Sequence, residues 1–317
     1  MPWREIQRTN FRKLSCLAAF LELDPKALSQ NPRFSLNLPK RLAKKMAKQT
    51  LQDPLVRQFV PLPEEEKVIP GYSLDPVQDA SFCKASKLLQ KYEGRALLLT
   101  NSACAMHCRY CFRQNFDYAP NLEYTEEIAL IQKDPSLQEV ILSGGDPLSL
   151  SDRILKQLLD SLSAIPHIKL IRFHTRFPIG IPERIDSSFL HLLENCPKQI
   201  VFVIHANHPN EFDSDVFAAL KSVQKLGIPV LLQSILLKDI NDDFLTLKHL
   251  FENSAYNGII PYYLHQLDRV SGAAHFDVPI ERGKMLIEKL RKSLPGYAVP
   301  HYVQEVPGEK SKTLIAL

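Results

Sequence analysis

From Arg95 onwards, short apolar runs alternate with segments whose apolar residues have helical spacing. The apolar runs are 96–99, 139–142, 169–173, 200–204, 230–237 and 259–264. The helical patterns are 125–132, 152–162, 183–193, 213–226, 244–252 and 279–290. Continuously apolar strands separated by helices of this length are typical of β-α-β units that build a parallel sheet. Six such units predict an α/β fold, a partial (β/α)6 barrel of the TIM type, because too little chain remains for eight units.

The residues before this alternation, 1–90, predict a helical N-terminal extension. Leucines at positions 14, 17 and 21 have helical spacing within 11–22. Proline at position 25 ends that helix, because it pushes the preceding residue out of the α region. Four prolines make 51–72 an irregular connector, and 80–92 is a further candidate helix. We therefore expect the extension at 1–90 and the barrel, with a C-terminal segment, at 91–317.

The charge of the chain is unevenly distributed. The net charge is +4, but residues 1–50 hold eleven Lys and Arg and only three Asp and Glu. Residues 40–48 have the pattern of a basic amphipathic helix, for which a solvated face is favoured over an acidic partner. The chain starts without the apolar core of a signal peptide, and no run approaches the about 18 apolar residues of a membrane span. These features predict a cytoplasmic protein with no membrane partner.

The first strand of the predicted sheet leads into a loop that holds Cys104, Cys108 and Cys111 in the spacing C-x3-C-x2-C. Three thiolates on one loop can face a single centre, and soft thiolate ligands favour iron–sulfur clusters or zinc. In a four-iron cluster, three thiolates leave one iron without a protein ligand, and that iron can bind a small molecule. A zinc site normally has four ligands, and His107 could be the fourth, although adjacent residues rarely reach one metal in tetrahedral geometry. The loop therefore predicts a [4Fe–4S] cluster, with zinc as the alternative.

Polar residues stand where the predicted strands end, which is the end that carries the chemistry in barrels of this type. The second strand is followed by Ser143, Gly144, Gly145 and Asp146. Two glycines let backbone approach a ligand closely, and Asp146 can cap the next turn. The later strands end in or lead into His174, Arg176, His205, Gln233, Ser234, His265 and Asp268. Together these side chains predict the mouth of an active site.

These residues resemble the lysine 2,3-aminomutase family of radical S-adenosylmethionine (SAM) enzymes, and most closely its short bacterial branch of elongation factor P β-lysylation proteins. The matching stretches are 95–99, 108–113, 143–148, 205–211, 233–237, 261–265 with Asp268, 272–276 and 308–313. The resemblance covers nearly all of the chain beyond Asp53. The sequence stops five residues after Lys312, which favours the short branch.

The resemblance implies three cofactors: a [4Fe–4S] cluster, SAM and pyridoxal 5′-phosphate (PLP). It implies that Cys104, Cys108 and Cys111 hold the cluster, and that Lys312 carries PLP while Arg95 faces the phosphate of PLP. It also implies contacts to SAM from Ser143, Gly144, Gly145, Asp146, His205 and Gln233.

The substrate that the resemblance implies is L-lysine. Arg113 would pair with its α-carboxylate, because a guanidinium binds a carboxylate with two parallel hydrogen bonds. Asp268 and Glu305 would bind its distal ammonium. The implied reaction is an isomerisation of (S)-α-lysine to (R)-β-lysine, which a separate ligase would attach to elongation factor P.

The implied partners are an external electron donor and, as an open possibility, a second copy of the chain in a homo-oligomer. Three alternative functions remain at this point. A radical SAM aminomutase could act on another amino acid, such as arginine or glutamate. A radical SAM enzyme that modifies RNA would fit the cysteine loop and the basic N-terminal residues, and a non-enzymatic interaction module would fit a zinc site.

Overall fold

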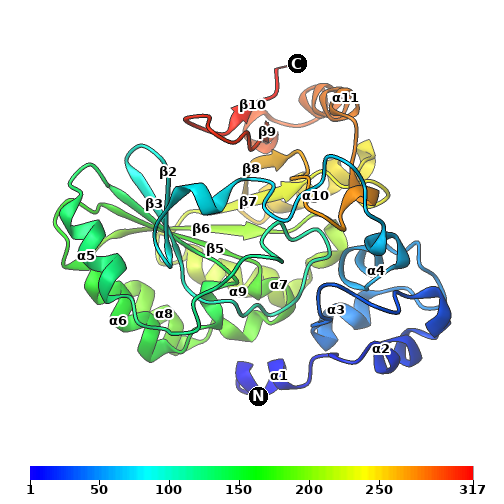
Figure 1. Ribbon diagram of the computed structural model, residues 1–317, viewed down its shortest axis with the longest axis horizontal. Coiled ribbons are helices and arrows are strands. Elements are labelled where there is room, and N and C mark those ends of the chain that lie inside the picture. The colour runs from blue at the N-terminus through cyan, green and yellow to red at the C-terminus, as the bar shows by residue number, and fades with distance from the viewer. Residues whose placement is uncertain (317) are drawn as a thin grey trace.

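The computed structural model describes residues 1–316, with eleven α-helices and ten strands in this range (Figure 1). The helices are α1 (Trp3–Arg8), α2 (Leu14–Leu21), α3 (Lys40–Lys45), α4 (Pro54–Phe59), α5 (Thr125–Lys133), α6 (Asp152–Ser163), α7 (Phe177–Gly180), α8 (Ser187–Glu194), α9 (Ser214–Gln224), α10 (Phe244–Tyr256) and α11 (Ile280–Arg291). The strands are β1 (Cys83–Ala85), β2 (Leu88–Tyr92), β3 (Arg95–Leu99), β4 (Glu139–Ser143), β5 (Leu170–Thr175), β6 (Gln199–His205), β7 (Val230–Ile235), β8 (Ile260–His265), β9 (His301–Gln304) and β10 (Thr313–Leu314).

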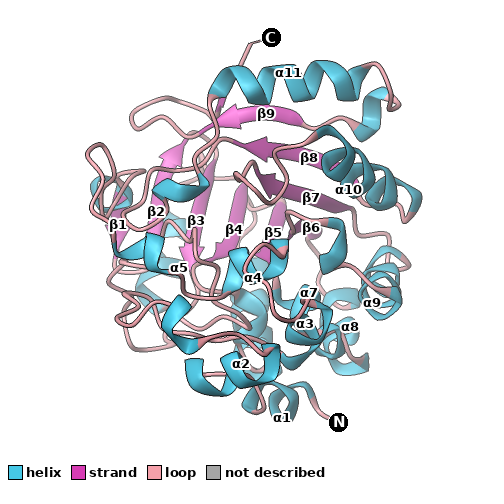
Figure 2. Cartoon of the chain, turned by 90° about the vertical axis from the view of Figure 1, so that its right-hand side faces the viewer, coloured by secondary structure: helices cyan, strands magenta, loops and turns pink. Residues whose placement is uncertain are grey.

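All ten strands form one sheet in chain order. Strands β3 to β9 run parallel to one another, whereas β1 and β2 at one edge and β10 at the other pair antiparallel. The strand direction turns progressively from β2 to β9, so the sheet is strongly curved (Figure 2). No pairing joins β1 to β10 within residues 1–316, so the curved sheet stays open. The predicted partial barrel of α/β type is confirmed.

The helices between the strands are specified by capping residues at their starts and by apolar residues along one face. Asp186, Asp213 and Asp243 each accept a hydrogen bond from a backbone amide in the first turn of α8, α9 and α10, which satisfies one unpaired donor of the helix start. In α6 the buried residues are leucines at helical spacing, Leu155, Leu158, Leu159 and Leu162. These helices cover the outside of the sheet, and the C-terminal ends of the parallel strands are left for polar residues.

The predicted helix at 80–92 is wrong. Only Asp79–Phe82 forms a 3-10 helix. The following residues form β1 and β2, and β2 makes a hairpin with β3 in which Tyr92 pairs with Arg95. Gly94 has φ +74° in the turn between them, a conformation that glycine adopts without strain. Pairing with the edge of the large sheet therefore outweighs the local preference for a helix.

The N-terminal residues form four short α-helices, α1 to α4, and two further predictions need correction. The connector at 51–72 contains α4, which begins with Asp53 as its cap and Pro54 in its first turn. The basic helix, α3, was expected to face solvent. Instead Arg41 lies 3.0 Å from carboxylate oxygens of Glu183 and Asp213, which both belong to the barrel, so α3 docks by charge on the barrel. The boundary at residue 90 stays a prediction.

Nearly all buried apolar side chains belong to one core. This core includes Trp3, Leu17 and Leu42 of the N-terminal helices together with the strands and helices of the barrel. In residues 1–316 no helix is long and apolar enough to cross a membrane.

Candidate active site

The cysteine loop, residues 100–113, is fastened to the turn that follows β4. The carbonyl of Ser143 accepts from the amide of Thr100 over 2.9 Å, and Gly145 N donates to the carbonyl of Asn101 over 2.7 Å. A Cβ on Gly144 would lie 2.9 Å from the same carbonyl oxygen, and a Cβ on Gly145 would lie 2.4 Å from the carbonyl oxygen of Ala103. The two glycines thus permit close contact between the turn and the cysteine loop. Their contact with SAM stays a prediction.

The side chain of Asp146 connects this turn to the residues that follow β5. Its buried carboxylate accepts from the hydroxyl of Thr175 over 2.7 and 2.9 Å, and from the amides of Leu148, Arg176 and Phe177 over 2.8 to 3.0 Å. Burial raises the pKa of Asp146 to about 6 in spite of these donors. The predicted capping role is confirmed. Because both carboxylate oxygens already accept hydrogen bonds, Asp146 acts by holding the backbone of the turn in place.

The three cysteine side chains are half-buried and close enough to influence one another electrostatically. Burial raises the pKa of all three thiols, that of Cys111 to about 11. No group of three His, Cys, Asp or Glu side chains within residues 1–316 is arranged around a single ion. A four-iron cluster needs no such arrangement, because each thiolate binds a different iron. Three mutually close, soft ligands therefore fit a cluster.

The N-terminal residues build the outer wall of the cysteine loop. Asn10 and Asn37 donate from their side-chain amides to the carbonyls of Ala105 and Cys104 over 2.8 and 3.0 Å. His107, the alternative zinc ligand, belongs to this wall, because its ring stacks on that of Phe34 with centroids 4.4 Å apart. Its Nδ1 also lies 2.8 Å from the carbonyl oxygen of Ser35. These contacts give His107 a structural role away from the thiols.

Lys312 and Glu305 meet beyond the end of β9. Lys312 Nζ donates to Glu305 Oε2 over 2.9 Å, and the hydroxyl of Tyr92 donates to Glu305 Oε1 over 2.7 Å. Burial alone would raise the pKa of Glu305, but the charge of Lys312 and the hydroxyl of Tyr92 hold this pKa below its usual range. The carboxylate therefore stays ionised and binds the ammonium group of Lys312, and its contact with the ammonium of a substrate stays a prediction.

Asp268 is the second predicted acid of this region. Burial raises the pKa of Asp268 to about 7, and the charge of Lys312 opposes the rise while that of Glu305 adds to it. Asp268 and Glu305 line the same cavity, which has a volume of about 550 Å³. The two acids are thus brought together, and a cation placed between them would favour the charged form of both.

Arg113 has a partner that the sequence did not reveal. Its Nε donates to Asp79 Oδ2 over 2.7 Å, and Lys91 Nζ lies 2.8 Å from Asp79 Oδ1 and 3.8 Å from Glu305 Oε1. A row of alternating charges therefore runs from Arg113 through Asp79, Lys91 and Glu305 to Lys312. Residues 80–92 were expected to be helical, and that error hid the direction in which Asp79 and Lys91 point.

Arg95 begins β3, at the end opposite to the cysteine loop. Its guanidinium carbon lies 5.5 Å from the ring centroid of Tyr92, whose hydroxyl binds Glu305. The curvature of the sheet thus brings the hairpin of β2 and β3 next to the segment that follows β9. Tyr92 and Glu305 thus link Arg95 to Lys312, and the role of Arg95 toward a phosphate stays a prediction.

Three histidines with buried ring nitrogens lie near Lys312. In residues 1–316, Nε2 of His174, His205 and His265 has no hydrogen-bond partner, and neither has Oε1 of Gln233, which pairs with His205 in the strand register. Burial lowers the pKa of the three histidines, that of His205 to about 3, and the charge of Lys312 adds to the effect. Buried polar atoms are normally satisfied. These neutral side chains, aimed into one region, therefore fit a polar cofactor beside Lys312.

Known proteins share these features. Residues 92–176, from the end of β2 to Arg176, match the family described as 4Fe-4S single cluster domain. The L-lysine 2,3-aminomutase of Escherichia coli is 40% identical over 288 residues, which are 90% of this chain and 84% of that protein. The enzyme of the same name from Haemophilus influenzae is 39% identical over 287 residues, with 89% of this chain and 85% of that protein covered.

The chain belongs to the lysine 2,3-aminomutase family. It is accordingly an isomerase of the aminomutase type and a radical SAM enzyme, with a [4Fe–4S] cluster and SAM as cofactors. The L-lysine 2,3-aminomutase of Clostridium subterminale is 32% identical over 266 residues, and 64% of that longer protein is covered. Among solved structures, a radical SAM methyltransferase from Sphaerobacter thermophilus matches with a TM-score of 0.49 and 18% identity, over 68% of each chain.

Proposed function

We propose that this protein is an L-lysine 2,3-aminomutase that uses PLP and converts (S)-α-lysine to (R)-β-lysine. The observation that carries the proposal is the ammonium of Lys312 on the carboxylate of Glu305, with Asp268 lining the same cavity. Glu305 therefore already binds an ammonium group here, and a second acid lines the same cavity. Relatives named L-lysine 2,3-aminomutase at 40 and 39% identity support the choice of lysine.

Cys104, Cys108 and Cys111 would hold the cluster. With SAM, the cluster supplies the radical chemistry that breaks an unactivated C–H bond, which no protein side chain can do. SAM would be contacted by Ser143, Gly144, Gly145, Asp146, His205 and Gln233. The glycine turn serves this role by lying directly against the cysteine loop, so that a ligand on the cluster also meets the turn.

Lys312 would carry PLP, and Arg95 would face its phosphate. PLP supplies the conjugated system through which an amino group can move between neighbouring carbons. The neutral rings of His174, His205 and His265 would help to exclude water from the surroundings of Lys312. Their Nε2 atoms would bind the cofactors.

The substrate would be oriented at both ends. The Nε of Arg113 is taken by Asp79, which leaves its two terminal nitrogens for the α-carboxylate of lysine. Once Lys312 is bound to PLP, Glu305 and Asp268 would bind the distal ammonium of the substrate. A shorter or uncharged side chain would leave these buried acids unpaired, so the pair would set the specificity for lysine.

The product would be destined for attachment to elongation factor P by a separate ligase. The resemblance to the short bacterial branch supports this link. An external electron donor would reduce the cluster.

A panel of amino acids tests the proposal. Anaerobically reconstituted protein with SAM, PLP and dithionite should convert lysine at least about tenfold faster than arginine, which corresponds to about 1.4 kcal/mol of discrimination. Glutamate should not be converted, because its distal carboxylate would meet two acids. Faster conversion of arginine or glutamate would contradict the assignment of lysine.

A further inference from the structure

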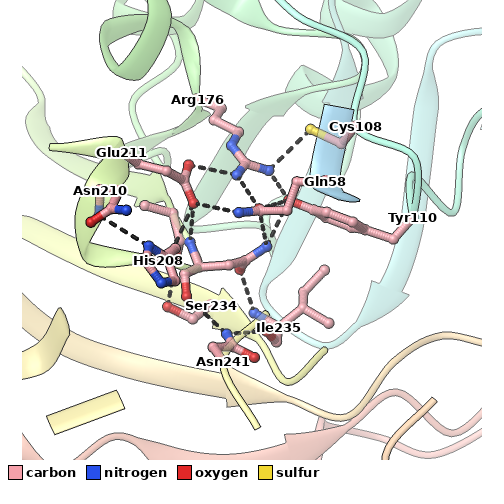
Figure 3. A network of polar contacts seen from close by, with 12 residues as sticks. Gln58, Cys108, Tyr110, Arg176, His208, Asn210, Glu211, Ser234, Ile235 and Asn241 are labelled. Atoms are coloured by element: carbon pink, nitrogen blue, oxygen red, sulfur yellow. Dashed lines mark hydrogen bonds and ion pairs between the residues drawn. The ribbon is translucent and has the colours of Figure 1, made fainter. Parts of the chain in front are cut away.

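Arg176 joins the end of β5 to the cysteine loop. It directly follows β5 and is 8% exposed. Its Nη1 donates to Cys108 Sγ over 3.0 Å and also contacts the hydroxyl of Tyr110. Figure 3 shows the guanidinium between Glu211 and Cys108. A buried positive charge therefore lies in hydrogen-bond contact with one of the three thiols.

The guanidinium is held from its other side. Its Nη2 donates to Glu211 Oε2 over 2.6 Å and to Gln58 Oε1 over 2.8 Å. Glu211 is itself fixed, because it is fully buried and its Oε1 accepts from the amides of Asn207 and His208 over 2.7 and 3.0 Å. The direction of Arg176 is thus set by a carboxylate that cannot turn away.

Gln58 adds the N-terminal extension to this network. It lies on α4, and its side-chain oxygen also accepts from the hydroxyl of Tyr110 over 3.1 Å. Its backbone carbonyl accepts from the amide of Arg109 over 2.9 Å. Helix α4, the cysteine loop and the ends of two strands therefore converge on Arg176, which gives a structural role to the extension (Figure 3).

A charged donor at a cluster sulfur has a defined effect. Reduction adds a negative charge to the cluster, and a nearby cation that donates to a ligating sulfur stabilises the reduced form. Burial strengthens this effect, because the interaction is poorly screened. The carboxylate of Glu211 acts in the opposite direction, since a negative charge disfavours further negative charge.

We infer that Arg176 is a positioning residue that orients Cys108 and raises the reduction potential of the cluster, with Glu211 and Gln58 holding its guanidinium in place. The inference rests on the proposed function, because it requires the cluster on Cys104, Cys108 and Cys111. It assigns to this network the control of how readily the enzyme accepts its electron.

A redox titration followed by electron paramagnetic resonance tests this role on anaerobically reconstituted, full-length protein. Arg176→Gln should shift the equilibrium about tenfold toward the oxidised cluster, which is a potential lower by about 59 mV for one electron. Arg184→Gln is the matched control. Arg184 is also a fully buried arginine with a carboxylate partner, Asp152 at 2.8 Å, but it does not contact the cysteines, so the potential should stay unchanged.

An unchanged potential in Arg176→Gln at full iron content would overturn the inference. If that variant does not fold, Gln58→Ala replaces it. This change removes a side chain that holds the guanidinium without altering any charge, so the equilibrium should shift toward the oxidised cluster, and an unchanged or higher potential would overturn the inference. The proposed function fails separately, namely if the unmodified protein takes up no iron.

Discussion

Lys312 and Glu305 form an ion pair of 2.9 Å between Nζ and Oε2, seven residues apart on the segment that follows β9. Lys312→Ala should abolish the absorbance of bound PLP and lower the rate of amino migration more than about a thousandfold, the scale seen when an essential catalytic residue is removed. Iron content should stay unchanged, because Lys312 lies apart from the cysteines. Lys310→Ala, which removes an exposed lysine of the same segment, is the control. Retained migration in Lys312→Ala would refute the PLP assignment.

The turn after β4 allows a purely steric test. Gly145→Ala places a methyl group 2.4 Å from the carbonyl oxygen of Ala103, so the cysteine loop must move. We expect a loss of about 1–3 kcal/mol in the free energy of unfolding and a lower iron content after reconstitution. Gly296→Ala is the matched control, because a Cβ there meets nothing within 4 Å. Equal iron content in the two variants would argue against close packing of turn and loop.

Asp79 should be required for stability. Asp79→Ala leaves the guanidinium of Arg113 without its partner and removes one of the two carboxylates near Lys91. Both cations are largely buried, so we expect the free energy of unfolding to fall by about 3 kcal/mol or more in urea titrations. Asp117→Ala, an exposed aspartate four residues after Arg113, should change it by less than about 0.5 kcal/mol. Similar values for both variants would contradict the ion-pair row.

Binding of lysine should depend on pH through Asp268. The pKa of Asp268 is raised to about 7, so its carboxylate gains its charge as the pH rises through 7. The ε-ammonium of lysine stays charged in this range, because its pKa is about 10.4. KM for lysine should therefore fall as the pH rises from 6 to 8 and then level off. The same decrease in Asp268→Asn would show that another group is responsible.

The buried histidines should make the fold sensitive to acid. The pKa of His174, His205 and His265 is lowered in the folded protein, whereas in the unfolded chain it is about 6.5. Below pH 6.5 the unfolded state binds more protons than the folded state. The free energy of unfolding therefore decreases as the pH is lowered, by up to about 1.4 kcal/mol per pH unit for each histidine. Urea titrations at pH 7.5, 6.5 and 5.5 measure this slope. The slope should decrease in His174→Gln and stay the same in His191→Gln, which changes an exposed histidine.

The barrel could be predicted from the sequence because its signal is local. Buried parallel strands are apolar throughout, and capped helices have a regular spacing, so β4 begins at the predicted residue and the other parallel strands lie close to their predicted ranges. The hairpin of β1, β2 and β3 could not be predicted in this way. β2 becomes a strand by pairing with β3, and β1 by pairing with β2. β3 offers this edge because it is itself held in the parallel sheet by β4, which the local spacing of residues 80–92 does not reveal.

The candidate site divides in the same manner. The cysteines and the glycine turn stand out through residue type and spacing, whereas Glu305 and Lys312 were named only through the resemblance to the aminomutase family. Asp79 and Lys91 do not, because their partners Arg113 and Glu305 are distant in the sequence and meet them only in the folded chain. Asp146 was recognised as a cap, but its four donors lie at or after the ends of two strands, and only the sheet brings these ends together.

The migration of nitrogen tests the central claim most directly. Anaerobically reconstituted protein should be incubated with SAM, PLP, dithionite and lysine that carries ¹⁵N only on its α-amino group, and the product should be examined by nuclear magnetic resonance. The account predicts that ¹⁵N appears on C3 of β-lysine. Lysine that keeps all its ¹⁵N on C2 while the cluster is intact and reduced would contradict the account.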